Sequence, residues 1–375
     1  MNIAINCRVL NERQGGPFRY THNLIRELAA LDRKNRYFLI FNTKIYEFDF
    51  PIPDNFQCVY LRPANKLIFD YISLPLYTWR IKFDIILFPK NTFSPLVRGN
   101  KIPFFNDIVY FEKLGFREFK FFDNLHHTIM VPVAGRLSRV NFSISDFTAS
   151  RMMALLHIPR ERIRVIKLGI EKKFIKIEET KKLDTVIKKY GIQKPFFFYS
   201  GSLSPRKNMT NIIKAFVAIR DRVPHNIYVT GGYSWRDSDI FSLLKENGIE
   251  DRVVKLGFLS DDELIAMYSM ADAYLYPSLY EGFGLPILEA QACGCPVITS
   301  TAASCPEVAG DAAILVDPYD VSDIARAMLE VVQNRSHRSR IVKAGYKNAA
   351  KYSWKKTAME FMEVFKEISG DTNRG

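Results

Sequence analysis

Two glutamates, Glu281 and Glu289, stand eight positions apart in the stretch LYEGFGLPILEA, on either side of a glycine-rich break. A carboxylate accepts hydrogen bonds from two adjacent hydroxyls, so such a pair suits the diols of a sugar and of a ribose. Pro286 favours a helix start between them, and the amino end of a helix attracts phosphate. Glu289 could equally do no more than stabilise that helix start, so the spacing alone leaves both interpretations open.

Two loops are suited to binding an anion. The first is GSLSPRKN, which places Arg206 and Lys207 just before an expected helix. A guanidinium fork and an ammonium charge at a helix start suit a diphosphate. In the second loop, Gly15 and Gly16 precede another expected helix, where backbone amides can approach an anion closely. Taken alone, each loop could also be an ordinary turn.

Several kinds of site are absent from the sequence. It contains neither the dinucleotide fingerprint G-x-G-x-x-G nor a P-loop, which argues against a nicotinamide enzyme and an NTPase. The five cysteines are scattered, which suits a reducing compartment better than a disulfide framework. Cys293 and Cys295 lack a second pair with zinc spacing, so we expect no metal.

The excess of positive charge lies entirely in the first half of the chain. Residues 1–200 hold 33 Lys and Arg against 18 Asp and Glu, and the remainder hold 20 against 22. A basic half attracts nucleic acid, an anionic membrane surface or a phosphorylated substrate. The apolar stretch LIFDYISLPLYTW carries Asp70 and Pro75 and is shorter than the roughly 20 residues of a membrane span. Since no secretion signal is evident, we expect a cytoplasmic location.

Short apolar runs alternate with helical stretches throughout the chain. Buried strands separated by helices favour parallel sheets with right-handed crossovers. The strand candidates are IAINCRVL, YFLIFN, CVYL, DIILFP, IPFFND, VNFSIS and RVIKLG, then FFFYSGS, IYVTGG, VVKLGF, AYLYPS, PVITS and AILVD. A Lys- and Glu-rich segment, 170–194, separates the two series and is typical of a linker with one surface helix. The pattern predicts two doubly wound α/β domains, with ligands in a cleft at the carboxyl ends of the strands.

EGFGLPILEA, GSLSPRKN and the Gly15–Gly16 loop together resemble the retaining glycosyltransferases of family 4, which carry an E-x7-E element and have the GT-B fold of two facing Rossmann-like domains. SISDFTA, VIKLGIEKKF, VVKLGFLSDDEL and SCPEVAGDAAILVDP follow in the order of that family, so the resemblance covers nearly the whole chain. It implies an acceptor-binding domain over 1–175 and a nucleotide-sugar-binding domain over 176–350. It also implies a helix over 351–375 that crosses back to the first domain. A dimer contact is the alternative role of the apolar side of this helix, along which the sequence largely places Trp354, Met359, Phe361, Met362 and Phe365.

The resemblance assigns roles to individual residues. Glu289 would hold the ribose hydroxyls, and Glu281 those of the transferred sugar. Arg206 and Lys207 would neutralise the donor diphosphate. The expected donor-binding residues are Gly15, Gly16, Asn106, Gly201, Phe283, Gly284, Leu285 and Glu289, and the expected catalytic residues are Glu281, Arg206, Lys207 and Asp107.

The sequence departs from the family at one position. The family often has a His-Asp pair after a strand of the first domain, where this chain has Asn106 and Asp107. An amide can hydrogen-bond a sugar hydroxyl but cannot act as a general acid or base. Proton transfer by Asn106 is therefore excluded.

The implied reaction moves a hexose from a nucleotide-diphosphate sugar, without metal or cofactor, and retains the anomeric configuration. GLPILEAQACGCPVITS looks most like bacterial polysaccharide-assembly enzymes, mannosyltransferases among them, which favours GDP-mannose over UDP- or dTDP-linked donors. The implied acceptor is a glycan or lipid-linked chain in surface polysaccharide synthesis, lipopolysaccharide included. No nucleic-acid partner is expected.

Two rival functions use the same residues differently. A glycoside hydrolase also needs two carboxylates, but its site requires no Arg-Lys pair. A nucleic-acid or membrane binder would use the basic half, above all residues 111–127, where Lys113, Arg117 and Lys120 alternate with phenylalanines. Such a helix could lie on an anionic bilayer, on the inner face of the membrane, or be partly buried with solvated lysines.

Overall fold

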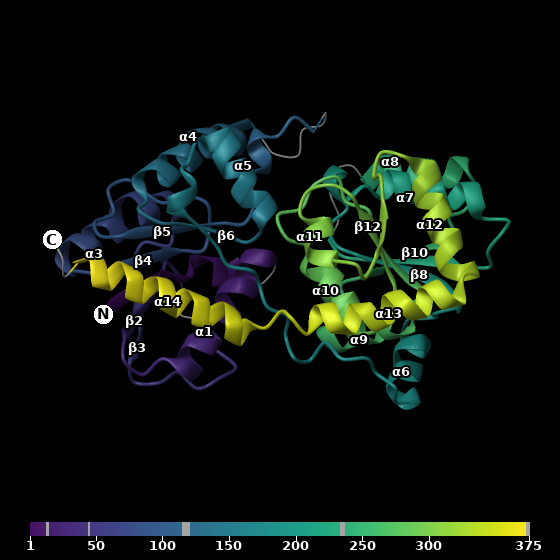
Figure 1. Ribbon diagram of the computed structural model, residues 1–375, viewed down its shortest axis with the longest axis horizontal. Helices are drawn as coiled ribbons and strands as arrows, with labels where there is room; N and C mark the ends of the chain where they lie inside the picture. Colours follow the sequence, from purple (N-terminus) through teal and green to yellow (C-terminus); the bar gives the residue numbers. More distant parts are fainter. Residues whose placement is uncertain (13–14, 44–45, 115–120, 233–236, 373–375) are drawn as a thin grey trace. The chain divides into compact units, whose positions relative to one another are not determined.

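The computed structural model describes residues 1–12, 15–43, 46–114, 121–232 and 237–372. The chain divides into two compact units. Unit 1 consists of Met1–Glu112, Phe119–Gly169 and Ser353–Gly375, and unit 2 of Lys113–Glu118 and Ile170–Tyr352. Each unit is a parallel sheet with helices packed on it (Figure 1).

Among the described residues, unit 1 holds a seven-stranded sheet in the order β3-β2-β1-β4-β5-β6-β7, and all its pairings are parallel. The inner strand β4 is a fully buried apolar run, IILF, as a sheet covered on both faces requires. The strands are β1 Asn2–Asn6, β2 Arg36–Phe41, β3 Phe56–Tyr60, β4 Ile85–Phe88, β5 Lys101–Phe105, β6 Asn141–Ser143 and β7 Ile163–Val165.

The helices of unit 1 include the last helix of the chain. They are α1 Gly16–Leu31, α2 Lys66–Ile68, α3 Leu74–Arg80, α4 Phe121–Leu137, α5 Asp146–Leu156 and α14 Trp354–Thr372, with a π-helical turn, Phe69–Ser73, between α2 and α3. Helix α14 lies beside α1 (Figure 1). Its buried Phe361 ring contacts the rings of Tyr20, Phe104 and Phe142, so α14 is part of the unit 1 core.

Unit 2 holds, within the described residues, a six-stranded parallel sheet in the order β10-β9-β8-β11-β12-β13. Its strands are β8 Phe196–Ser200, β9 Asn226–Thr230, β10 Val253–Gly257, β11 Ala273–Tyr276, β12 Val297–Ser300 and β13 Ile314–Val316. Its helices are α6 Thr180–Tyr190, α7 Met209–Ile219, α8 Asp237–Glu246, α9 Asp261–Met270, α10 Leu285–Ala292, α11 Cys305–Ala309, α12 Val321–Gln333 and α13 Arg335–Ala349. Strands β8 and β11 are neighbours, so the loops that follow them lie at the same sheet edge.

Every predicted apolar run overlaps a strand of the structure, although RVIKLG shares only Arg164 and Val165 with β7, and the predicted surface helix within 170–194 is α6. Two expectations are corrected. Residues 111–127 are not one continuous helix, because residues 112–114 lack helical structure and α4 begins at Phe121; residues 115–120, Arg117 and Lys120 among them, lie outside the described part. Met359, expected on the apolar side of the last helix, is instead exposed.

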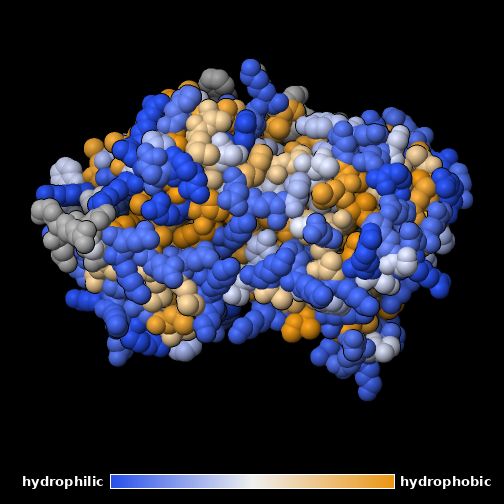
Figure 2. All heavy atoms as spheres, in the orientation of Figure 1, coloured by the Kyte–Doolittle hydropathy of each residue, from blue (hydrophilic) through white to orange (hydrophobic). Residues whose placement is uncertain are grey.

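The face of the molecule shown in Figure 2 is mainly polar, with apolar side chains among the polar ones over both units. None of the described helices is both long enough and apolar enough to cross a membrane.

Candidate functional site

The basic loop after β8 is held in a fixed shape. Gly201 takes a φ of 145° directly after the strand, a conformation that favours glycine. A short 3-10 turn, Pro205–Lys207, carries both cations, and Asn208 then adopts a left-handed conformation at the start of α7. The Asn208 side chain donates to the carbonyl oxygens of Pro277, at 2.9 Å, and Pro318, at 2.6 Å. The loop is therefore tied to the loops after β11 and β13.

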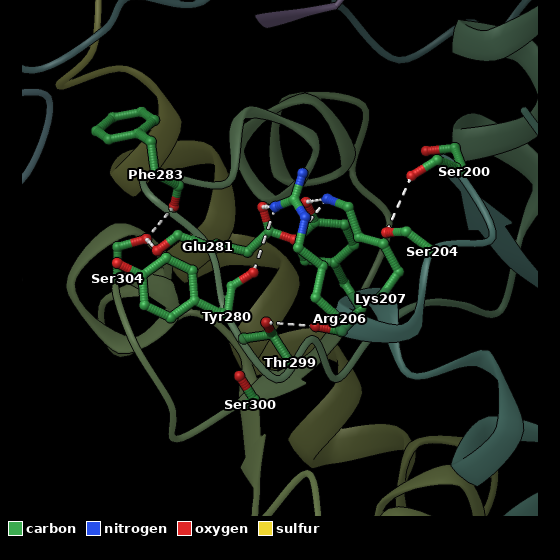
Figure 3. Close-up of polar contacts among 12 residues, drawn as sticks. Ser200, Ser204, Arg206, Lys207, Tyr280, Glu281, Phe283, Thr299, Ser300 and Ser304 are labelled. Atoms are coloured by element: carbon green, nitrogen blue, oxygen red, sulfur yellow. Dashed lines mark hydrogen bonds and ion pairs between the residues drawn. The ribbon is translucent and has the colours of Figure 1, made fainter. Parts of the chain in front are cut away.

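Lys207 and Glu281 form a buried ion pair (Figure 3). The Lys207 Nζ lies 2.5 Å from Glu281 Oε1 and donates to the Tyr276 hydroxyl at 2.7 Å. Arg206 approaches the other carboxylate oxygen, with its Nη1 3.4 Å from Glu281 Oε2. Lys207 is 8% exposed and Glu281 is 6% exposed, so the pair is largely removed from solvent. Two cations and one anion leave this cluster with an excess of one positive charge.

The charges of this cluster depend on each other. Burial raises the pKa of Glu281, but the charges of Lys207 and Arg206 outweigh it and hold that pKa below its usual value. Burial lowers the pKa of Lys207, and the carboxylate of Glu281 opposes that change. A buried charge without a partner is costly, so each residue keeps the other ionised.

The loop that carries Glu281 is fixed by hydrogen bonds from both sides. The backbone N–H of Leu279 donates to the Arg206 carbonyl oxygen at 2.7 Å. The Ser304 hydroxyl donates to the carbonyl oxygens of Glu281 and Phe283, both at 2.9 Å (Figure 3). These bonds fix the backbone from which the Glu281 carboxylate extends.

Gly284 and Leu285 form the expected helix start after that loop. Gly284 has a φ of 103° and precedes α10, with Pro286 in the first turn. A Cβ at Gly284 would lie 3.0 Å from the side chain of Ile287, so the position is both conformationally and sterically suited to glycine. The helix start predicted from the sequence is confirmed.

Glu289 lies in α10 and is 3% exposed. The Tyr268 hydroxyl donates to Glu289 Oε2 at 3.5 Å. The Ser200 hydroxyl shares hydrogen bonds with the hydroxyls of Tyr268, at 2.8 Å, and Tyr274, at 3.0 Å. A buried polar network therefore links Glu289 to the end of β8, next to the basic loop.

The remaining predicted site residues lie in unit 1. Gly15, with a φ of 87°, and Gly16 are exposed at the start of α1. Asn106 and Asp107 follow β5. The Asn106 side chain donates to the Pro89 carbonyl oxygen at 3.0 Å, and the Asn106 backbone N–H donates to Asn91 Oδ1 at 3.0 Å. The structure thus brings Arg206, Lys207 and Glu281 of unit 2 into contact. The two glycines, Asn106 and Asp107 belong to unit 1.

Sequence reasoning misses three residues that act through hydroxyl groups. Tyr276 accepts from Lys207, Ser304 fixes the Glu281 loop, and Tyr268 contacts Glu289. Ser304 begins SCPEVAG, part of a stretch that resembles the family, whereas Tyr276 lies in AYLYPS, which the sequence marks only as a strand candidate.

Comparison with known proteins finds similarity to glycosyltransferases. Residues 180–348 match the family described as glycosyl transferases group 1. The O-antigen chain mannosyltransferase B of Escherichia coli is 32% identical over 232 residues, which cover 61% of this chain and 61% of that protein. The serotype-specific mannosyltransferase WbdA of Escherichia coli is 28% identical over 242 residues, which cover 62% of this chain and 30% of that protein. The matches therefore span less than two thirds of these relatives.

Solved structures match over nearly the whole chain. Sucrose-phosphate synthase from Thermosynechococcus elongatus has a TM-score of 0.76 at 17% identity, covering 99% of this chain and 100% of that chain. WaaG, a glycosyltransferase involved in lipopolysaccharide biosynthesis, has a TM-score of 0.74 at 15% identity, covering 97% of this chain and 99% of that chain. At such identities the likeness concerns the fold alone. The predicted α/β fold is confirmed: the chain has the GT-B fold, and its residues 180–348 match the glycosyl transferases group 1 family.

Proposed function

We propose that this protein is a retaining glycosyltransferase that transfers a hexose from a nucleotide-diphosphate sugar to a glycan or lipid-linked acceptor in bacterial surface polysaccharide synthesis. Membership of family 4, with its E-x7-E element at Glu281 and Glu289, is part of this proposal. The observation that carries it is the charge cluster of Arg206, Lys207 and Glu281 within the residues that match glycosyl transferases group 1.

GDP-mannose is the proposed donor, and mannose the transferred sugar. The similarity to two Escherichia coli mannosyltransferases supports this choice, one of them named for the O-antigen chain. We place the reaction in the cytoplasm, at the inner face of the membrane, where a lipid-linked acceptor would be reached.

The proposed chemistry uses the excess positive charge of the cluster. As the bond between the sugar C1 and the diphosphate oxygen breaks, negative charge grows on the leaving diphosphate. Arg206 and Lys207 stabilise that charge, and one such donor is worth roughly 3 kcal/mol in a closed site. The acceptor hydroxyl attacks C1 from the same face and passes its proton to a phosphate oxygen of the donor, so no side chain has to act as a base.

Each remaining residue has a proposed role in binding. Glu289 holds the ribose hydroxyls, and Glu281 orients Lys207 while it contacts the transferred sugar. The backbone amides at Phe283 and Gly284 lie beside that sugar, and the exposed start of α1 at Gly15 and Gly16 meets the diphosphate. Asn106 and Asp107 contact sugar hydroxyls. The proposed reaction uses neither a metal nor a cofactor.

The test is release of nucleoside diphosphate from GDP-, UDP-, dTDP- and ADP-linked sugars in the presence of EDTA. We expect release from GDP-mannose, and its loss in Arg206→Ala and Glu289→Ala. Lys214→Ala is the matched control, because Lys214 is an exposed cation on α7. Binding of the free nucleoside diphosphates is measured by thermal shift in the same preparations. Absence of both release and binding would overturn the proposal. Release that occurs without EDTA but is lost when EDTA is added would overturn metal independence.

A further inference from the structure

A row of large apolar side chains is exposed along one side of residues 66–80 in unit 1. Ile68, Ile72, Leu76 and Trp79 follow one another at spacings of three or four residues, which places them on one helical face. Leu76 is 49% exposed and Trp79 is 59% exposed. We call these four residues the apolar stripe.

The opposite side of the same segment is firmly packed. Phe69, Leu74 and Thr78 are buried, and Phe69 and Leu74 belong to a core cluster that includes Phe38 and Ile86. The stripe is therefore presented by an anchored element, and its exposure does not result from a loosely attached segment.

The exposed apolar surface continues onto neighbouring elements. The indole N–H of Trp79 donates to the Leu96 carbonyl oxygen at 2.8 Å, and the Leu96 side chain is itself exposed. On α4, Leu125 and Ile129 are exposed one helical turn apart. His126, which follows Leu125, is hydrogen-bonded to the Tyr71 hydroxyl at 3.1 Å. This bond joins α4 to the segment that carries the stripe.

Cations surround this surface and few acids oppose them. Residues 62–98 contain six Lys and Arg against two Asp. Asp70 pairs with Arg8 at 3.3 Å, and Asp84 accepts from the Asn2 backbone N–H at 2.7 Å. Asp70 and, at the start of α4, Asp123 are the acids whose charges act on the cation of Lys66. The exposed cations are Arg62, Lys66, Arg80, Lys82 and Arg98.

We propose that the apolar stripe and its basic rim dock this protein on an anionic lipid bilayer. Ile, Leu and Trp side chains enter the boundary between headgroups and acyl chains, where the amphipathic ring of Trp is favoured. The surrounding Lys and Arg side chains attract anionic headgroups. The bilayer is thereby a proposed partner of the transferase. Only the purpose of the docking, access to a lipid-linked acceptor, rests on the proposed function.

Charge favours a bilayer over a second copy of the chain as the occupant. A symmetric dimer through this surface would place the same patch against itself. The exposed cations of one copy would then lie against an equally basic surface across a desolvated contact, and like charges there are repelled. An anionic bilayer accommodates both parts of the surface. Its acyl boundary takes the apolar side chains, and its headgroups attract the cations.

The experiment is sedimentation of the full chain with vesicles, without any nucleotide. One set of vesicles is phosphatidylcholine, and the other contains about 30% phosphatidylglycerol, which supplies the negative surface charge. We expect binding to the anionic vesicles at least about tenfold tighter than to the neutral ones, because several cations take part. The combined variant Leu76→Ser with Trp79→Ser should lose that binding.

The matched control is Ile175→Ser with Met359→Ser, which removes two exposed apolar side chains outside the proposed surface, 65% and 48% exposed. It should bind vesicles as the unaltered protein does. Thermal unfolding verifies that both variants are folded, and a blue shift of Trp79 fluorescence on vesicles, absent in Trp79→Phe, reports insertion of that side chain.

Three outcomes would overturn the proposal: no vesicle binding, equal binding to neutral and anionic vesicles, or equal loss in the control variant. A dimer in solution that Leu76→Ser with Trp79→Ser dissociates would assign the surface to a second copy instead. Nucleoside diphosphate release is measured separately without vesicles, so failure of the docking surface and failure of the proposed transferase are distinguishable.

Discussion

The two units present their positive charge in opposite ways. In unit 2, Lys207 is buried against Glu281, and the cluster has one defined geometry. In unit 1, the cations within 62–98 are mostly exposed and border apolar side chains. A buried pair responds strongly to loss of a partner and weakly to salt, whereas exposed charges respond the other way. The comparison indicates a site for one ligand in unit 2 and a docking surface in unit 1.

The largest effect is expected from Lys207→Ala. It leaves Glu281 buried without its closest cation, and breaking a buried pair costs about 3 kcal/mol or more of stability. It also removes a charge that we assign to the leaving diphosphate, so transfer should fall about 100-fold or more. Urea unfolding and nucleoside diphosphate release measure the two effects.

A double variant separates stability from activity. Lys207→Met combined with Glu281→Gln removes both charges of the pair, so it should recover most of the lost stability. It should recover none of the transfer. If the single and double variants were equally stable, the interdependence of Lys207 and Glu281 would be disproved.

Salt provides the next contrast. Raising NaCl from about 0.1 to about 1 M shortens the Debye length from about 10 to about 3 Å. Vesicle binding through the exposed cations should weaken about tenfold or more, while the free energy that couples Lys207 to Glu281 in a double-mutant cycle should change little. Equal salt sensitivity of the two quantities would contradict the contrast between the units.

Acid should act on the buried pair of unit 2. Burial raises the pKa of Glu281, but Lys207 and Arg206 bring the net value below 4.5. The stabilisation that this carboxylate contributes is therefore fully present above pH 4.5 and is lost as the pH falls through the lower pKa of the folded state. Below pH 4.5, unfolding free energy should fall more steeply in the unaltered protein than in Glu281→Gln, by up to about 1.4 kcal/mol per pH unit.

The exposed Glu250 serves as the control for that titration. Glu250→Gln should follow the unaltered protein across the acid range, because it removes a carboxylate on the surface and leaves the buried pair of Lys207 and Glu281 intact. Urea unfolding at a series of pH values measures all three slopes. A Glu281→Gln slope equal to that of the unaltered protein would contradict the pairing.

The strands are predictable because they are buried on both faces. FFFYS, for example, is entirely apolar apart from its last residue, and β8 is buried throughout. The secondary structure of residues 66–80 is harder to predict, because the sequence shows an apolar stretch interrupted by Asp70 and Pro75. In the structure Pro75 lies in the first turn of α3, where proline is tolerated, and the stretch is helical with one buried and one exposed side.

The candidate site is predictable only in part. The loops after β8 and β11 are expected to meet, because parallel strands end at a common edge. The pairing of Lys207 with Glu281, 74 positions apart, depends on the order of the strands, which a single sequence does not reveal. Hydroxyl partners such as Tyr276 and Ser304 are less predictable still, because a serine or tyrosine in a buried strand or helix gives no sign of which group it contacts.

The smallest effect concerns the network around Glu289 and sharpens the comparison within unit 2. Glu281 is held by charges, whereas Glu289 is contacted by the neutral hydroxyl of Tyr268. Tyr268→Phe removes that hydrogen bond and the one between Tyr268 and Ser200, each worth about 1 kcal/mol, so it should leave the fold intact while loosening the carboxylate. If Glu289 binds the ribose, preference for a nucleoside diphosphate over its 2′-deoxy form should fall about fivefold in competition binding. Tyr190→Phe, which removes a hydroxyl bonded to Glu263 on α9, should leave that preference unchanged. An equal loss of affinity for both nucleotides would instead mean that Tyr268 only supports packing, because a position that orients the ribose ligand must affect the two forms differently.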